Sequence, residues 1–115
     1  MHKRFELVCS DDGKFLFRLR GDDGNVLLSS HTCESKIMAQ SEVLQARNSL
    51  RDDNRLEAQH RSDGMHCYVV RGRNGSELAR SPMTRSDAEL VTLHSAILAA
   101  ANNAPLVDLT KRRTA

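Results

Sequence analysis

The residues best suited to nucleophilic chemistry in this 115-residue chain are its three cysteines. Cys33 stands two residues before Ser35, a predicted helix cap, and His31 is close to it in sequence. A cysteine nucleophile needs a thiolate, which a helix N-terminus or a neighbouring base favours. Cys33 is therefore the candidate reactive thiol. The corresponding positions of the internal repeat described below hold Thr84 and Pro82, so we favour a structural role as a small loop residue.

Histidine and cysteine together could bind a metal ion. A structural zinc site needs four converging ligands, which are often arranged as two closely spaced pairs. His60, His66 and Cys67 are near one another, but alternate side chains of a strand point to opposite faces, which separates Cys67 from His66. We interpret them as ordinary strand residues and predict no metal and no cofactor. His94 falls at a sheet-facing position, and we expect it at the rim of a helix with its ring tip in water.

Arginine and lysine provide the candidate contacts to nucleic acid. The predicted solvent face of a sheet and the C-terminal tail carry them: Arg18, Arg20, Arg71, Lys111, Arg112 and Arg113. Sheets that bind single strands also need exposed aromatic rings for base stacking. The aromatic residues here share the opposite, core-facing parity: Phe5, Phe15, Phe17 and Tyr68. The acidic side chains of Glu6, Glu57 and Asp108 share the solvent face and would balance the arginines as cross-strand pairs.

An internal repeat positions all of these residues. A shift of 51 places aligns identical residues without a gap, among them Arg4 with Arg55, Glu6 with Glu57, Asp12-Gly13 with Asp63-Gly64, and Arg20-Gly21 with Arg71-Gly72. The matches fall at turns, caps and strand starts, where the backbone restricts the choice of residue. We therefore predict a tandem duplication, with repeats at about 4–54 and 55–105.

Each repeat begins with three alternating runs, which predict strands near 4–8, 14–20 and 26–30 and near 55–59, 66–71 and 77–81. Dipeptides that tolerate the positive φ of a tight hairpin separate them: Asp12-Gly13, Asp23-Gly24, Asp63-Gly64 and Asn74-Gly75. Helices follow the caps Ser35 and Ser86, because the apolar residues behind each cap recur at helical spacing.

The segment 106–110 matches the opening strand of each repeat and predicts a closing strand. The fold class is therefore α+β: tandem β-β-β-α-β units that share one antiparallel sheet, with two helices packed on one face. Residues 1–115 form a single domain, because either half is too small for its own core, and 111–115 is a basic flexible tail.

Several motifs are similar to those of the YegP-like family, small bacterial proteins built from a repeated domain of unknown function. The motifs are F-E-x-x-x-x-x-x-G-x-F-x-F-R-L from Phe5 to Leu19, S-x-x-x-x-S-K from Ser30 to Lys36, and NAPLVDLT from Asn103 to Thr110. The resemblance implies that terminal strands are exchanged between the units. The chain departs from the family where an aromatic precedes each helix, here Cys33 and Thr84, and where a glycine stands in each helix, here Glu42 and Leu93.

Composition excludes several classes of protein. Hydrophobic residues make up 39% and charged residues 28%, with a net charge of +2, which is typical of a folded chain and weak for a nucleic-acid binder. No run approaches the ~18 apolar residues of a membrane span, and the start lacks the apolar run of a secretion signal. Three unpaired cysteines favour the reducing cytoplasm.

Our leading hypothesis is a non-enzymatic interaction or structural module whose partner is an unknown protein or a second copy, as a monomer or a homodimer. The alternative is weak nucleic-acid binding, and the third hypothesis is a cysteine-dependent activity at Cys33.

Overall fold

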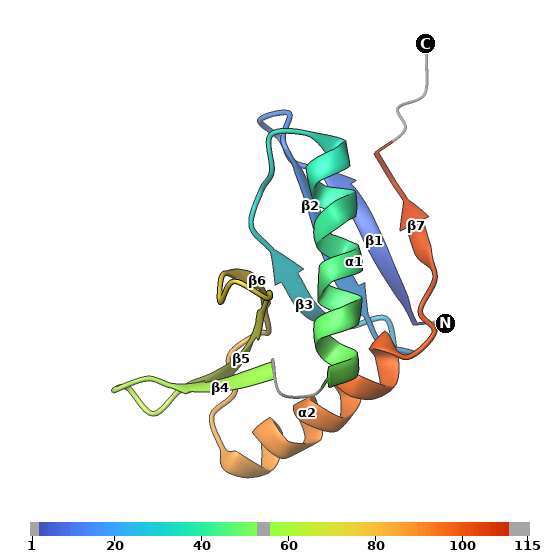
Figure 1. The fold of residues 1–115 in the computed structure, drawn as a ribbon. Coiled ribbons are helices and arrows are strands. Elements are labelled where there is room, and N and C mark those ends of the chain that lie inside the picture. The colour runs from blue at the N-terminus through green and yellow to red at the C-terminus, as the bar shows by residue number, and fades with distance from the viewer. Residues whose placement is uncertain (1–2, 53–55, 111–115) are drawn as a thin grey trace.

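A computed structural model describes residues 3–52 and 56–110. It contains seven strands and two helices (Figure 1). In chain order they are β1 (Arg4–Cys9), β2 (Phe15–Arg20), β3 (Val26–Ser30), α1 (Lys36–Asp52), β4 (Leu56–His60), β5 (His66–Arg71), β6 (Glu77–Arg80), α2 (Asp87–Ala101) and β7 (Leu106–Asp108). The predicted α+β class is confirmed. Neither described helix is long and apolar enough to cross a lipid bilayer.

The strands form one mixed sheet in the order β4-β5-β6-β3-β2-β1-β7. Each three-stranded meander is antiparallel, and β3 joins β6 to connect the two meanders. The prediction of a wholly antiparallel sheet is wrong at one edge, since β7 runs parallel to β1. The chain reaches β7 through helix α2 rather than through a hairpin, and such a crossover connection permits parallel pairing.

The hairpins form where the glycine dipeptides predict them. Gly13 and Gly64 have φ of +82° and +85°, a conformation that costs most other residues energy. Nothing lies within 4 Å of a Cβ built at either position, so the requirement for glycine there is conformational rather than steric.

One apolar core joins both helices to the sheet. Phe5 and Phe17 of the sheet pack in the same cluster as Val43 of α1 and Ile97 of α2. Ser86 caps α2 as predicted, because its hydroxyl accepts a hydrogen bond from the amide of Glu89 at 3.1 Å. This cluster contains residues of both helices and both meanders, and a smaller cluster of Leu7, Cys33 and Ala39 lies in the first meander.

The two meanders make the same local contacts 51 residues apart. The hydroxyl of Ser30 accepts a hydrogen bond from the Phe17 amide at 2.9 Å, and that of Ser81 accepts one from the Tyr68 amide at 2.8 Å. The guanidinium groups of Arg20 and Arg71 likewise donate to the carbonyls of Gly24 and Gly75, respectively. These side chains tie each third strand and each second hairpin to the middle strand of its meander.

Candidate functional site

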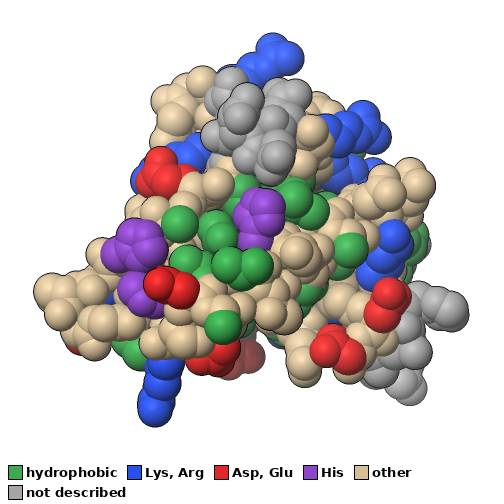
Figure 2. Space-filling model, turned by 90° about the horizontal axis from the view of Figure 1, so that it is seen from below, with side chains coloured by type: hydrophobic (Ala, Val, Ile, Leu, Met, Phe, Trp, Pro, Cys, Tyr) green, Lys and Arg blue, Asp and Glu red, His purple; other side chains and the backbone are tan. Residues whose placement is uncertain are grey.

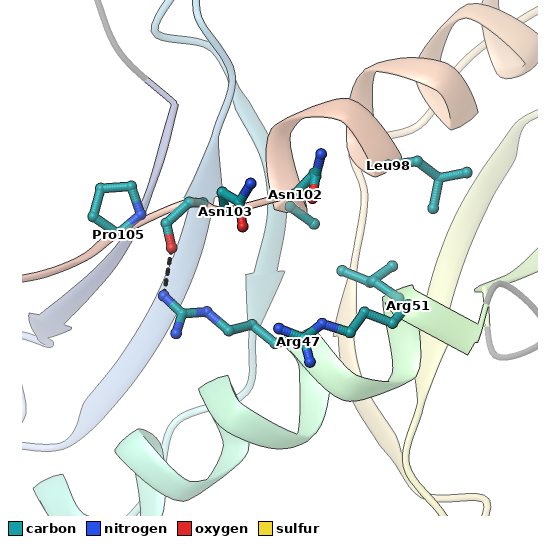
Figure 3. Close-up of a pocket in the computed structure, with 9 residues that line it drawn as sticks. Arg47, Arg51, Leu98, Asn102, Asn103 and Pro105 are labelled. Atoms are coloured by element: carbon teal, nitrogen blue, oxygen red, sulfur yellow. Dashed lines mark hydrogen bonds between the residues drawn. The ribbon is translucent and has the colours of Figure 1, made fainter.

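A cavity of about 730 Å³ lies where the C-terminal ends of α1 and α2 meet (Figure 3). The last turns of both helices and the segment that leads to β7 line it: Arg47, Leu50, Arg51, Leu98, Ala101, Asn102, Asn103, Ala104 and Pro105. Its volume is within the range of small-molecule sites, roughly 300–1,000 Å³.

The wall formed by 102–105 follows from the way α2 ends. Asn102 leaves helical geometry with ψ of 112°, and Asn103 has φ of +60°. Asparagine tolerates this left-handed conformation better than most residues. Pro105 cannot continue the helix. The chain therefore turns sharply, and the carbonyl of Ala104 accepts a hydrogen bond from Arg47, the dashed line in Figure 3.

Two arginines from consecutive turns of α1 line the opposite side. Arg47 donates a hydrogen bond to the carbonyl oxygen of Ala104, and its Cζ lies 5.3 Å from the centre of the Phe5 ring. These contacts fix the Arg47 guanidinium in place. Arg51 lies one turn further along on the same face of the helix and is exposed.

The cavity is electrostatically one-sided. Both arginines are charged at any ordinary pH. None of the nine lining residues is acidic. The carbonyls at a helix C-terminus carry partial negative charge, and Lys3 offsets part of it at α2 by donating to the carbonyl of Ala99. The described contacts of Arg51 include no carboxylate, so its charge is the one most available to a ligand.

The walls of the cavity come from positions that are 51 apart in the sequence. Arg47 corresponds to Leu98, Leu50 to Ala101, and Arg51 to Asn102. Figure 3 shows Arg47 reaching from α1 toward the segment that leads to β7, and Arg51 running along α1 toward Arg47. Helix α1 thus supplies two cations where α2 supplies an apolar side chain and an amide. Sequence reasoning did not find this site, although two arginines four residues apart on one helix were a visible signal.

The arginines predicted to contact nucleic acid are largely engaged with carboxylates. Glu6 is only 1% exposed, and it accepts hydrogen bonds from Nε of Arg4 and Nε of Arg20, each at 2.8 Å. A nitrogen of Arg18 lies 3.4 Å from the same carboxylate. Burial raises the pKa of Glu6, but the hydrogen bonds from Arg20 and Arg4 outweigh it, and the pKa is lowered overall.

Arg71 pairs with Glu57 at 3.3 Å, so the structure does not bring the three predicted arginines into one free patch. Three guanidinium groups nevertheless surround the single carboxylate of Glu6. Among the buried side-chain nitrogen and oxygen atoms of the described residues, Nε of Arg18 is the one without a hydrogen-bond partner. Residues 111–113 of the predicted tail lie outside the described residues.

Cys33 has the environment of a structural thiol. It is 6% exposed, and its Sγ lies 3.5 Å from Oε1 of Glu42. Burial and the Glu42 carboxylate raise the pKa of Cys33 to about 11, which opposes thiolate formation. His31 instead lies 3.2 Å from Glu77. The two departures from the family pattern in the first repeat, Cys33 and Glu42, therefore contact each other.

Figure 2 shows histidine side chains (purple) beside hydrophobic side chains (green) on one face of the molecule. His60 and His66 come together across β4 and β5, with their Nδ1 atoms 2.7 Å apart. Cys67 is buried, and the described residues contain no group of three or more side chains able to hold a metal ion. His94 is half-buried, with its ring centre 5.4 Å from that of Tyr68.

Comparison with known proteins gives relatives of unknown function. No family model matches the chain. A UPF0339 protein of Mannheimia succiniciproducens is 23% identical over 107 residues, which are 93% of this chain and 95% of that protein. A UPF0339 protein of Pseudomonas aeruginosa is 26% identical over 76% of this chain and 80% of its own length.

Two solution NMR structures have the same fold. The protein of unknown function yegP from E. coli matches with a TM-score of 0.88 at 24% identity, over 98% of this chain and 97% of its own. A UPF0339 protein of Shewanella oneidensis also matches with a TM-score of 0.88, at 20% identity, over 96% of this chain and 93% of its own. The predicted resemblance to the YegP-like family is confirmed. No name among these relatives indicates an enzymatic or other specific function.

Proposed function

We propose that this chain is a non-enzymatic binding module that holds a small organic anion in the cavity between the C-terminal ends of α1 and α2. The observation that carries the proposal is the composition of the described lining: two guanidinium groups, an apolar wall and no carboxylate. A guanidinium forms paired, charge-assisted hydrogen bonds with carboxylate or phosphate groups.

The two walls indicate the class of ligand. Arg47 and Arg51 would bind the anionic group, and Leu98 and Ala101 would contact an apolar body attached to it. The contacts of Arg47 with Ala104 and with the Phe5 ring already hold its guanidinium in place. Less side-chain freedom is therefore lost on binding, which favours affinity.

The lining supports binding rather than catalysis. Its described residues include no serine, threonine, cysteine, histidine or acidic residue that could attack a substrate or transfer a proton. The site can hold and orient an anion, and it has no group to transform one.

The architecture that creates the cavity is, in our proposal, a tandem duplication in one cytoplasmic domain of residues 1–115, with repeats at about 4–54 and 55–105 and a closing strand at 106–110. The recurrence of side-chain hydrogen bonds 51 residues apart supports it. The pairing of β7, which follows the second repeat, with β1 of the first repeat supports an exchange of terminal strands. Such an exchange would bring the two helix ends together around one cavity.

The experiment is an NMR titration of the ¹⁵N-labelled chain with benzoate, and with benzamide as the uncharged analogue. We expect benzoate to shift the amides of 47–51 and 98–105, and Arg51→Gln to weaken binding about tenfold through the loss of one charged hydrogen bond. Arg73→Gln, at an exposed arginine in the β5–β6 hairpin, is the matched control and should leave the affinity unchanged. Equal binding of benzamide, or full affinity in Arg51→Gln, would refute the proposal.

A second candidate is nucleic-acid binding through Arg18, Arg20 and Arg71. The three guanidinium groups around Glu6 favour it, because they leave positive charge on that face. We expect salt-dependent retention on a single-stranded oligonucleotide that is lost when these three arginines are replaced by alanine. Circular dichroism would verify folding, and Arg51→Gln should not change the retention.

A further inference from the structure

The strands β1 and β4 occupy corresponding positions in the two meanders, but among the described strands only β1 has a further strand on its outer side. Strand β7 pairs with β1 at one end of the sheet. At the other end lies β4, which has β5 as its neighbour and no described strand on its outer edge (Figure 1). An edge of this kind exposes unpaired backbone donors and acceptors.

The pairing of β1 with β7 shows what the equivalent edge of β4 offers. The Phe5 amide donates to the Pro105 carbonyl at 2.8 Å, and the Leu109 amide donates to the Leu7 carbonyl at 2.8 Å. Successive residues of a strand direct their backbone groups to alternate sides, so Leu56 and Ala58 direct theirs outward from β4. They correspond to Phe5 and Leu7.

The residues of β1 are more buried than the corresponding residues of β4. Leu7 and Glu6 are 0% and 1% exposed: Leu7 packs with Cys33 and Ala39, and the Glu6 carboxylate lies among arginines. At the corresponding positions of β4, Ala58 is exposed and the Glu57 side chain is 53% exposed. The β4 edge therefore has room for an added strand.

Charge indicates what that strand must carry. Lys36, the first residue of α1, holds β7 in place through its Nζ, which lies 2.5 Å from Oδ2 of Asp108. The first residue of α2 at the equivalent position is Asp87, which is 90% exposed. His66 approaches it only to 4.0 Å. The sign of the charge at the helix start is thus reversed between the two edges.

We propose that the outer edge of β4 binds an extended segment of a partner protein, parallel to β4, with a lysine or arginine opposite Ala58 that pairs with Asp87. Main-chain hydrogen bonds to Leu56 and Ala58 supply affinity, and the charge at Asp87 supplies selectivity. This site is separate from the cavity between the helix ends and does not depend on it.

A second copy of the chain suits this edge poorly. Two β4 strands paired about a two-fold axis bring the exposed Glu57 side chains toward each other, and like charges across strands are destabilising. A β7 strand from a second copy places Asp108 next to Asp87. A basic segment of another protein meets neither repulsion.

The test uses two synthetic peptides that span residues 103–110, one with the natural sequence and one with Asp108→Lys. We expect the lysine peptide to shift the amides of Leu56, Ala58 and Asp87 and to bind roughly threefold to fivefold more tightly than the natural peptide, the effect of one exposed ion pair. In the Asp87→Lys variant this preference should reverse. Ala58→Pro removes an outward donor without touching the β4–β5 ladder, so it should abolish binding while the β5 amides stay protected.

Equal affinity for the two peptides, or an unchanged preference in Asp87→Lys, would overturn the proposal. The proposal would also be overturned if neither peptide shifted the amides of the β4 edge. If Ala58→Pro does not fold, the peptide preference of Asp87→Lys still tests the proposal. Sedimentation of the chain alone is the further control. Self-association that Ala58→Pro abolishes would assign the edge to a second copy and would also overturn the proposal.

Discussion

Replacement of Glu6 by glutamine should destabilise the fold far more than the same change at Glu57. The two residues are 51 positions apart and lie at equivalent positions inside strands β1 and β4. Glu6 is 1% exposed and lies against Arg4, Arg18 and Arg20, whereas Glu57 is 53% exposed and pairs with Arg71. The side-chain change is the same at both positions, so a difference in the loss of stability reports the difference in burial and in ion pairing.

The expected magnitudes follow from these surroundings. Removal of one partner of a buried ion pair costs about 3–5 kcal/mol, because the other charge stays buried and unpaired. The three arginines are 27–39% exposed, so water screens them partly. We expect about 2–3 kcal/mol for Glu6→Gln and less than about 1 kcal/mol for Glu57→Gln, as for exposed pairs.

The pH dependence gives an independent check. The pKa of Glu6 is lowered from its ordinary value of 4.5, because hydrogen bonds from Arg20 and Arg4 outweigh the effect of burial. A lowered pKa contributes stability that is present above the unfolded pKa and is lost as the pH falls through the folded pKa. The wild-type chain should therefore lose stability below about pH 4.5 more steeply than Glu6→Gln does.

The assay is urea denaturation followed by circular dichroism at several pH values, supported by thermal melts. For a domain of this size, 2–3 kcal/mol corresponds to roughly 8–12 °C in Tm. Equal losses in the two variants, or identical acid sensitivity of wild type and Glu6→Gln, would refute the assignment of Glu6 as a buried counter-ion.

Three further predictions concern other parts of the chain. Arg47→Ala should lower the free energy of unfolding by about 1.5–2.5 kcal/mol, through loss of its contacts with Ala104 and Phe5, while Arg51→Ala changes it by less than about 0.5 kcal/mol in urea titrations. Iodoacetamide at pH 7.5 should modify the half-buried Cys9 before Cys33, and Glu42→Gln should accelerate the reaction of Cys33 in mass-spectrometric mapping, because Glu42 raises its pKa. Lys36→Ala should speed hydrogen exchange at Val107 but not in β4, because the Lys36 ammonium group pairs with Asp108 of β7. Lys36 and Thr110 hold the pKa of Asp108 below its usual range. In the wild-type chain, strong acid is therefore needed to break this pair and loosen β7 in the same way.

The sequence predicted the hairpins, the helix cap and the core-facing strand residues well, because each depends on neighbouring residues of the chain. The glycines at 13 and 64 adopt the positive φ that their hairpins require, and Ser86 caps its helix. Alternation placed Phe5 and Phe17 in the core, where both are fully buried. These outcomes depend on residues within a few positions of one another, so a single chain segment contains the necessary information.

Alternation also placed Glu6 correctly on the side opposite the core, but it did not predict the burial of Glu6. That burial requires arginine side chains from two paired strands to close over one carboxylate, which depends on the register of β1 against β2. The contact between His60 and His66 likewise appears only when β4 and β5 are paired in register.

The sequence by itself determined the strands, hairpins, caps and core parity, because backbone geometry and side-chain alternation are short-range properties. Only the tertiary structure decided that β7 runs parallel to β1, that no described strand pairs with the outer edge of β4, and that Arg47 and Arg51 line one cavity with Leu98 and Asn103. These features join segments about 50 to 100 residues apart, and their geometry is set by how two helices pack on one twisted sheet.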